Sequence, residues 1–328
     1  SPRLHPRAAI GLRLGVVALA VAVIAFAAVK ARPAGQPSTD QAGASAAVPA
    51  LQLPPAVPLN VLAHFGSDGS GPGQLHDARD IAVDPSGNLW LADAGNKRLL
   101  ELKPDGTPVG QWTDSAKGAL VEPDALAIAK DGIILADGEA GLLHKFDFQG
   151  QPIAAFEHDL HLGHPRGVGI DANGVIYVAD TANSRIAKVA PDGSPAGEIP
   201  GLDQPASLAL DDQGNVYAEL PDTKRLEKLA PDGSRQAAWA TPGSTTVTPP
   251  HLAWVPGRGL LVSAPGENVI VQFGPGGAVA GAFAAQPADG APAGQRPLGL
   301  AAARDNQSIW VLWNASSTVT QLALPPAG

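Results

Sequence analysis

The sequence predicts an all-β fold, a six-bladed β-propeller, over residues 59–328. A hairpin pattern, two short runs of alternating apolar residues around a glycine turn, occurs six times. A third run follows each hairpin, and a fourth run ends in a bulky apolar residue about every 40–47 positions. Four short strands per repeat of this length are typical of propeller blades. The 38 glycines and 32 prolines also disfavour long helices.

Residues 1–30 are predicted to form a membrane anchor. Residues 14–29 carry no charge, and the apolar stretch 8–29 is long enough to span a bilayer as one transmembrane helix. A cleaved signal peptide is the alternative, because residues 25–27 offer a small-residue cleavage site. Three arginines precede the apolar run and two basic residues follow it, which favours a cytoplasmic N-terminus. We therefore expect the propeller on the extracytoplasmic side of the cell membrane.

Residues 31–58 are predicted to be a disordered linker between the anchor and the propeller. This stretch holds six prolines and mostly small residues, with almost no aromatic or β-branched side chains. Such a composition cannot bury enough apolar surface to offset the entropy lost on ordering.

Six repeats follow the linker, and their strands are predicted in order along the chain. The hairpins lie at 80–93, 125–137, 167–180, 207–220, 251–264 and 299–313. The fourth runs end at Phe65, Trp112, Phe156, Ile199, Trp239 and Phe283. The last repeat lacks a fourth run, whereas an unassigned run, 59–66, precedes the first hairpin. We expect this N-terminal strand to complete the last blade and close the ring, which removes an exposed sheet edge.

The best repeat, PRGVGIDANGVIYVADTANSRI at 165–186, resembles the NHL repeat. ARDIAVDPSGNLWLADAGNKRL at 78–99 resembles it next best, and the later copies lose the Asp and Asn-x-Arg positions. The resemblance implies a six-bladed NHL-type propeller over residues 59–328. Its arrangement of anchor, linker and propeller is similar to membrane-tethered bacterial NHL propellers, including the outer sensor domains of some receptor kinases.

The middle residue of the P-x-G segment that opens each repeat is the candidate ligand-binding position, because the innermost strand enters there beside the propeller axis. Three of the six residues are charged: Arg79, Asp124 and Arg166. The others are Ala206, Pro250 and Leu298. Two arginines in an acidic protein are suited to clamping an anionic group. The alternative, which stays open here, is an Arg–Asp–Arg ion-pair network that closes the ring.

Two further charged patterns have mainly structural interpretations. Asp93/Arg98 and Asp180/Arg185 share a five-residue spacing, and their recurrence in the repeat favours ion pairs between strands. His158, His161 and His164 lie between two blades with two acidic neighbours and form a weak candidate metal cluster. Their spacing matches no zinc pattern, so a polar loop is favoured and no cofactor is predicted.

Charge and motifs limit the function. Residues 1–32 hold five basic and no acidic residues, so the remainder has 17 basic against 31 acidic side chains, a net charge of −14. Such a body repels nucleic acid. The chain has no cysteine and no recognised catalytic motif. We expect a non-enzymatic interaction or sensing module for a protein, peptide or cell-envelope polymer. The alternative is an extracytoplasmic hydrolase or lyase, lactonase-like or amidating-lyase-like, with a metal in the central channel.

Overall fold

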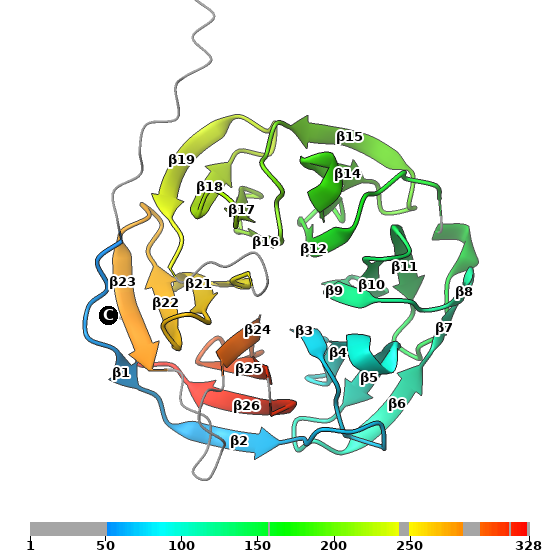
Figure 1. Cartoon of the computed structure of the whole chain (residues 1–328), viewed down its shortest axis with the longest axis horizontal. Helices are drawn as coiled ribbons and strands as arrows, with labels where there is room; N and C mark the ends of the chain where they lie inside the picture. The colour runs from blue at the N-terminus through cyan, green and yellow to red at the C-terminus, as the bar shows by residue number, and fades with distance from the viewer. Residues whose placement is uncertain (1–50, 157, 243–248, 285–295, 315, 327–328) are drawn as a thin grey trace, which may run out of the picture. The chain divides into compact units, whose positions relative to one another are not determined.

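In the computed structural model, described residues run from 51 to 326, apart from 157, 243–248, 285–295 and 315. They belong to one compact unit, residues 47–328, in which six small sheets are arranged around an axis (Figure 1). The predicted all-β six-bladed propeller is confirmed. The predicted transmembrane helix at 8–29 lies outside the described residues. Within those residues, no helix is long and apolar enough to cross a membrane.

Each blade is an antiparallel sheet whose first strand lies nearest the axis. Blade 1 contains β3 (Ala78–Val83), β4 (Leu89–Asp93), β5 (Arg98–Leu102) and β6 (Pro108–Trp112). Blade 3 contains β12 (Pro165–Ile170), β13 (Ile176–Asp180), β14 (Arg185–Val189) and β15 (Pro195–Pro200). Blade 4 contains β16 (Ser207–Leu210), β17 (Val216–Leu220), β18 (Arg225–Leu229) and β19 (Arg235–Ala240). Blade 5 contains β20 (Leu252–Val255), β21 (Gly259–Ala264), β22 (Val269–Phe273) and β23 (Val279–Ala284).

Blade 2 differs from the prediction because it has three strands, β9 (Pro123–Ala129), β10 (Gly132–Asp137) and β11 (Leu142–Phe146). In place of the fourth strand, one bridge pairs Phe146 with Pro152, and a 3-10 turn, η2 (Ala154–Phe156), follows. Phe156 is still buried, so the side chain keeps its predicted place in the core without a strand. A short ribbon, β7 (Asp114–Ser115) with β8 (Gly118–Ala119), lies at the rim between blades 1 and 2 (Figure 1).

Blade 6 joins the two ends of the described chain. β24 (Arg296–Ala302), β25 (Ser308–Asn314) and β26 (Thr318–Ala323) supply three strands, and β2 (Val61–Phe65) supplies the fourth. β2 pairs antiparallel with β26, with Phe65 opposite Val319. His64 and Thr320 form a side-chain hydrogen bond of 2.8 Å across this pair. The N-terminal strand therefore lies where the missing fourth strand was expected.

The propeller begins earlier in the sequence than predicted, because residues 51–58, which were assigned to the linker, pack on it. β1 (Val57–Pro58) pairs in parallel with β23, the outer strand of blade 5. Leu51 and Leu53 pack against the apolar core between blades 4 and 5. These leucines bury apolar surface that the small residues before them cannot offer. Residues 51–58 are thus part of the propeller, and residues 31–50 of the predicted linker lie outside the described residues.

Neighbouring blades are joined by a repeated contact between a bulky residue and a glycine. The residue that ends the fourth run of one blade packs on the glycine of the turn that follows the third strand of the next blade. The side chain makes the contact in four pairs, Phe65 with Gly106, Trp112 with Gly150, Ile199 with Gly233, and Trp239 with Gly277. In a fifth pair, Phe156 with Gly193, the backbone carbonyl of Phe156 lies against the glycine. All five glycines have φ between +74° and +90°, where residues with a Cβ are strained. This packing explains why both residue types recur with the repeat.

Candidate functional site

In blades 1, 2 and 3, the loop that enters the innermost strand is held by a buried aspartate at the end of the second strand. Asp137 accepts hydrogen bonds from the backbone N–H groups of Val121 and Glu122, both at 2.8 Å. Asp93 accepts one from His76, and Asp180 accepts one from Gly163. This recurring arrangement fixes the loops that carry side chains to one mouth of the central channel.

The two predicted strand-to-strand ion pairs are present and support these loops. Arg98 Nε lies 2.7 Å from Asp93, and Arg185 Nε lies 2.6 Å from Asp180. Arg98 also donates to the carbonyl of Gln74 in the entry loop, at 2.6 Å. These pairs therefore belong to the framework, as their recurrence predicted.

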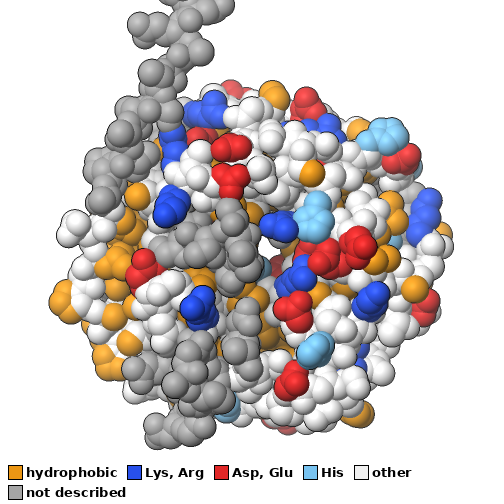
Figure 2. Space-filling view, viewed as in Figure 1, with side chains coloured by type: hydrophobic (Ala, Val, Ile, Leu, Met, Phe, Trp, Pro, Cys, Tyr) orange, Lys and Arg blue, Asp and Glu red, His pale blue; other side chains and the backbone are white. Residues whose placement is uncertain are grey.

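A cavity of about 390 Å³, here called the mouth pocket, opens at this mouth. Its ionisable lining residues are Asp77, Arg79, Glu122, Asp124, His164, Arg166 and His251, and its apolar ones are Ala206, Pro249 and Leu298. Figure 2 shows basic, acidic and histidine side chains gathered beside the central opening. Five of the six predicted ring positions line the pocket, and Pro249 lines it in place of Pro250.

Arg79 is the centre of an acidic group in this pocket. Its guanidinium donates to Glu122 Oε1 at 2.8 Å, to Asp77 Oδ2 at 3.2 Å, and to Asp124 Oδ1. Burial lowers the pKa of Arg79. The negative charge of Asp124 and the hydrogen bonds that Arg79 donates to Asp124 and Glu122 outweigh burial, so the pKa of Arg79 is raised. The Arg79–Asp124 half of the predicted Arg–Asp–Arg network is therefore present, with Glu122 and Asp77 as additional partners of Arg79.

Arg166 has a different environment. It is half-buried, and no ion pair joins it to any carboxylate among the described residues. It lines both the mouth pocket and a second cavity of about 290 Å³ along the axis. His251 also lines both cavities, and its Nδ1 lies 3.6 Å from Asp80 Oδ1. The pocket therefore presents a guanidinium and an imidazole on the path from the mouth to the channel.

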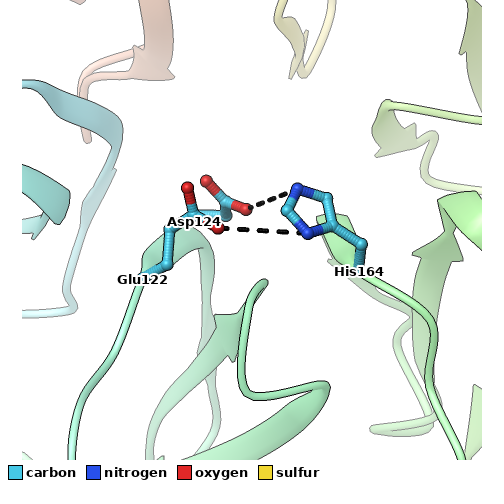
Figure 3. A group of neighbouring side chains, drawn as sticks. All are labelled: Glu122, Asp124 and His164. Atoms are coloured by element: carbon cyan, nitrogen blue, oxygen red, sulfur yellow. Dashed lines mark ion pairs between the residues drawn. The ribbon is translucent and has the colours of Figure 1, made fainter.

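Glu122, Asp124 and His164 form a second feature of the pocket. Figure 3 shows the two carboxylates facing the His164 ring. Glu122 Oε2 lies 3.9 Å from Nδ1, and Asp124 Oδ2 lies 3.7 Å from Nε2. Burial raises the pKa of Asp124, and the opposing effect of Arg79 does not cancel it. Among the described residues, this is the one group of three or more His, Asp or Glu placed to share a metal ion.

The predicted histidine cluster is not brought together. His164 lies in the mouth pocket, whereas His161 is 85% exposed and pairs with Asp159 at 3.0 Å. His158 is also exposed and is not part of the metal-type group. Glu122 was missed at the sequence level, and His164 was placed with the wrong partners. Both directly precede the proline that starts an innermost strand, a shared position that could have marked them.

Comparisons with known proteins support the fold. A model of the NHL repeat matches residues 162–189. NHL repeat-containing protein 3 of Homo sapiens is 23% identical over 137 residues, which is 38% of this chain and 39% of the relative. The Mus musculus protein of that name is 30% identical over 79 residues, 24% of this chain and 22% of the relative. The chain thus matches about two fifths and about one fifth of the lengths of these relatives.

Solved structures of lyases share the architecture. A catalytically inactive virginiamycin B lyase from Staphylococcus aureus, with quinupristin, superposes with a TM-score of 0.58 at 12% identity, covering 76% of this chain and 80% of that one. A streptogramin B lyase gives 0.55 at 13%, covering 80% and 97%. At such identities the likeness concerns the fold alone. With the repeat match, it supports an NHL-type propeller.

Proposed function

We propose that this propeller is a non-enzymatic binding module that holds an anionic group of its ligand in the mouth pocket, with Arg166 as the anchor. The observation that carries the proposal is the contrast between two arginines. Arg79 is shared by three carboxylates, whereas Arg166 lines the same pocket without an ion pair to the described residues. A half-buried guanidinium forms strong bidentate hydrogen bonds with a carboxylate or a similar group.

The shape and charge of the pocket limit the ligand. A cavity of about 390 Å³ takes a side chain or a terminal group rather than a whole polymer. Asp77, Glu122 and Asp124 on the Arg79 side oppose a ligand with many negative charges. The partner that fits best is a protein, peptide or cell-envelope polymer that presents one carboxylate.

Binding of defined probes tests this function. Short peptides with a free C-terminal carboxylate are compared with their amidated forms, and with uronic acid oligosaccharides, by calorimetry. Arg166→Ala should weaken binding of the carboxylate probes by about 10–100-fold, because a hydrogen bond to a charged group contributes about 1.5–3 kcal/mol to the binding free energy. Arg304→Ala, an exposed arginine outside the pocket, is the matched control and should bind normally. Carboxylate probes that bind Arg166→Ala as well as wild type, or no binding to wild type at all, would contradict the proposal.

Substitution of Arg79, the other arginine of the mouth pocket, tests whether this residue contributes to stability rather than to ligand binding. Arg79→Ala leaves Asp124, which is 5% exposed, without its cation. It should therefore lower the free energy of unfolding by roughly 1–3 kcal/mol, whereas Arg166→Ala should leave it nearly unchanged. An effect of both substitutions on stability alone would favour the ion-pair interpretation of the whole ring.

A second function is favoured by the group of Glu122, Asp124 and His164 in the same pocket. Two carboxylates and an imidazole are suited to acid–base chemistry or to holding a metal for a hydrolase or lyase. Two structures of similar fold are lyases. Incubation with quinupristin and divalent cations distinguishes the two functions. The binding-module proposal expects no turnover, and turnover that His164→Gln abolishes would replace it with an enzymatic function.

The membrane location is also part of the proposal. We infer that residues 1–30 hold the propeller on the extracytoplasmic side, as the apolar stretch 8–29 and its flanking charges favour. Protease added to intact cells or spheroplasts should release a fragment that begins within residues 31–50. Cleavage within 51–58 should be slow because Leu51, Leu53 and β1 pack on the propeller. Release only after the membrane is breached would reverse the orientation.

A further inference from the structure

Two carboxylates of the mouth pocket divide their oxygens between two partners. Glu122 Oε1 and Asp124 Oδ1 accept hydrogen bonds from Arg79. Glu122 Oε2 and Asp124 Oδ2 face the His164 ring, at 3.9 Å and 3.7 Å from its nitrogens. Figure 3 shows the acidic side chains, from the start of blade 2, opposite the histidine at the start of blade 3. The space between them is thus lined by two carboxylate oxygens and the two ring nitrogens, one of which can bind a given metal ion.

The atoms that face this space are not satisfied by the protein. Asp124 Oδ2 and His164 Nε2 are buried, and neither forms a hydrogen bond with the described residues. The Asp124 side chain is 5% exposed, and a Cβ at Gly138 would overlap Oδ2, so the oxygen is packed from behind. A buried carboxylate oxygen without a donor is costly. A positive group located between the carboxylates and the ring would remove that cost.

We propose that Glu122, Asp124 and His164 bind a divalent transition-metal ion, Zn²⁺ by preference. Their ligand atoms lie within 4.8 Å of one another, and ligands of a tetrahedral Zn²⁺ lie about 3.4 Å apart. Binding of the ion therefore requires these side chains to rotate toward one another. Three protein ligands leave a fourth position for water or a ligand atom, and an imidazole favours Zn²⁺ over Mg²⁺ or Ca²⁺. Arg79 holds the outer carboxylate oxygens, as partners of metal ligands commonly do.

The ion would change the charge of the pocket. Its three acidic residues and two arginines sum to −1 when the histidines are neutral, and a divalent ion brings the sum to +1. Metal binding should then favour an anionic ligand beside Arg166. The metal site itself does not depend on the proposed function, because it is tested with the metal alone.

The test is a metal titration of the full chain in detergent, after dialysis against a chelator. Calorimetry at pH 7.5 should show one Zn²⁺ bound per chain, and Co²⁺ should give the absorption bands of a four- or five-coordinate site. Asp124→Asn and His164→Gln should each weaken Zn²⁺ binding at least about tenfold. Glu122→Gln serves as a further variant, because Glu122 is more exposed and its loss threatens folding less. His161→Gln, an exposed histidine beside Asp159, is the matched control and should bind like wild type.

Three results would overturn the site. One is no stoichiometric Zn²⁺ binding by wild type. Another is binding that Asp124→Asn and His164→Gln leave unchanged although both variants are folded by circular dichroism. The last is binding that His161→Gln weakens as strongly as His164→Gln.

Discussion

At the scale of single residues, one buried aspartate in each of blades 1, 2 and 3 holds the loop that builds the mouth. Burial raises the pKa of Asp137, but hydrogen bonds from His144 and from the N–H groups of Val121 and Glu122 outweigh burial, so the pKa is lowered. The ionised side chain thus holds Glu122 in place. In blade 5 this position is Ala264, and the hydroxyl of Ser263 accepts the N–H of His251 instead, at 2.8 Å. Different side chains thus accept the backbone N–H groups of the equivalent loops. The later repeats can therefore lose the aspartate of the motif and still keep the fold.

The site residues could be predicted in part. The P-x-G position identified Arg79, Asp124 and Arg166, and all three line the mouth pocket. Their separate roles could not be predicted, because pairing of Arg79 with Asp124 depends on the conformations of two loops 45 positions apart. His164 illustrates the same limit. Its spacing from His161 suggested a local cluster, whereas its partners lie in the preceding blade.

At the scale of elements, blade 2 shows where a repeat pattern stops predicting strands. Pro152 has no N–H to donate, and after one bridge with Phe146 the ladder ends. Ile153 still donates to the carbonyl of Lys145 at 2.8 Å. The buried Phe156 then needs only a turn to reach the core. The apolar spacing therefore predicted burial correctly and secondary structure incorrectly.

The contact between a bulky residue and a turn glycine gives a sharp prediction for the interface between blades 1 and 2. Gly150→Ala should lower the free energy of unfolding by about 2–4 kcal/mol. The left-handed backbone costs about 1–2 kcal/mol in a residue with a Cβ, and the methyl group would overlap Trp112. Chemical denaturation measures this loss.

Gly201→Ala is the matched control for this substitution. Gly201 has φ +72°, close to the +74° of Gly150, but a Cβ there meets nothing within 4 Å. It should therefore cost about 1–2 kcal/mol, the backbone contribution alone. Equal losses in the two variants would show that the contact with Trp112 contributes nothing.

At the scale of the whole molecule, the segment before the first blade joins two blades across the closure of the ring. β1 pairs with β23 of blade 5, and β2 pairs with β26 of blade 6 (Figure 1). The loop after β2 is also fixed to blade 6, because Ser317 donates to Asp68 at 3.4 Å. The pairing of β2 with β26 was predictable, because the last repeat lacks a fourth run and Phe65 matches the bulky residues that end the fourth runs of the other repeats. The pairing of β1 with β23 was not predictable, because the two residues of β1 lie in a proline-rich stretch without a strand pattern.

Deletion of residues 51–65 should therefore open the ring. β26 would lose its partner and present unpaired N–H and C=O groups, a template for pairing with other chains. Partly buried residues of the segment, such as Phe65, also pack against the cores of blades 1 and 6. We expect a lower melting temperature and concentration-dependent aggregation, measured by calorimetry and light scattering.

Two other deletions distinguish the effect of ring closure on the melting temperature from the effect of a shorter chain. Removing residues 31–50 should leave the melting temperature unchanged, because the propeller contacts described begin at Leu51. Removing 51–58 should cause a smaller decrease than removing 51–65, because it takes away two leucines and one short parallel pair but leaves β2 on β26. A 51–65 deletion that remains monomeric with the wild-type melting temperature would show that the strand pairing at blade 6 does not stabilise the ring. The order of the three melting temperatures therefore measures how much of the stability depends on closure by β2.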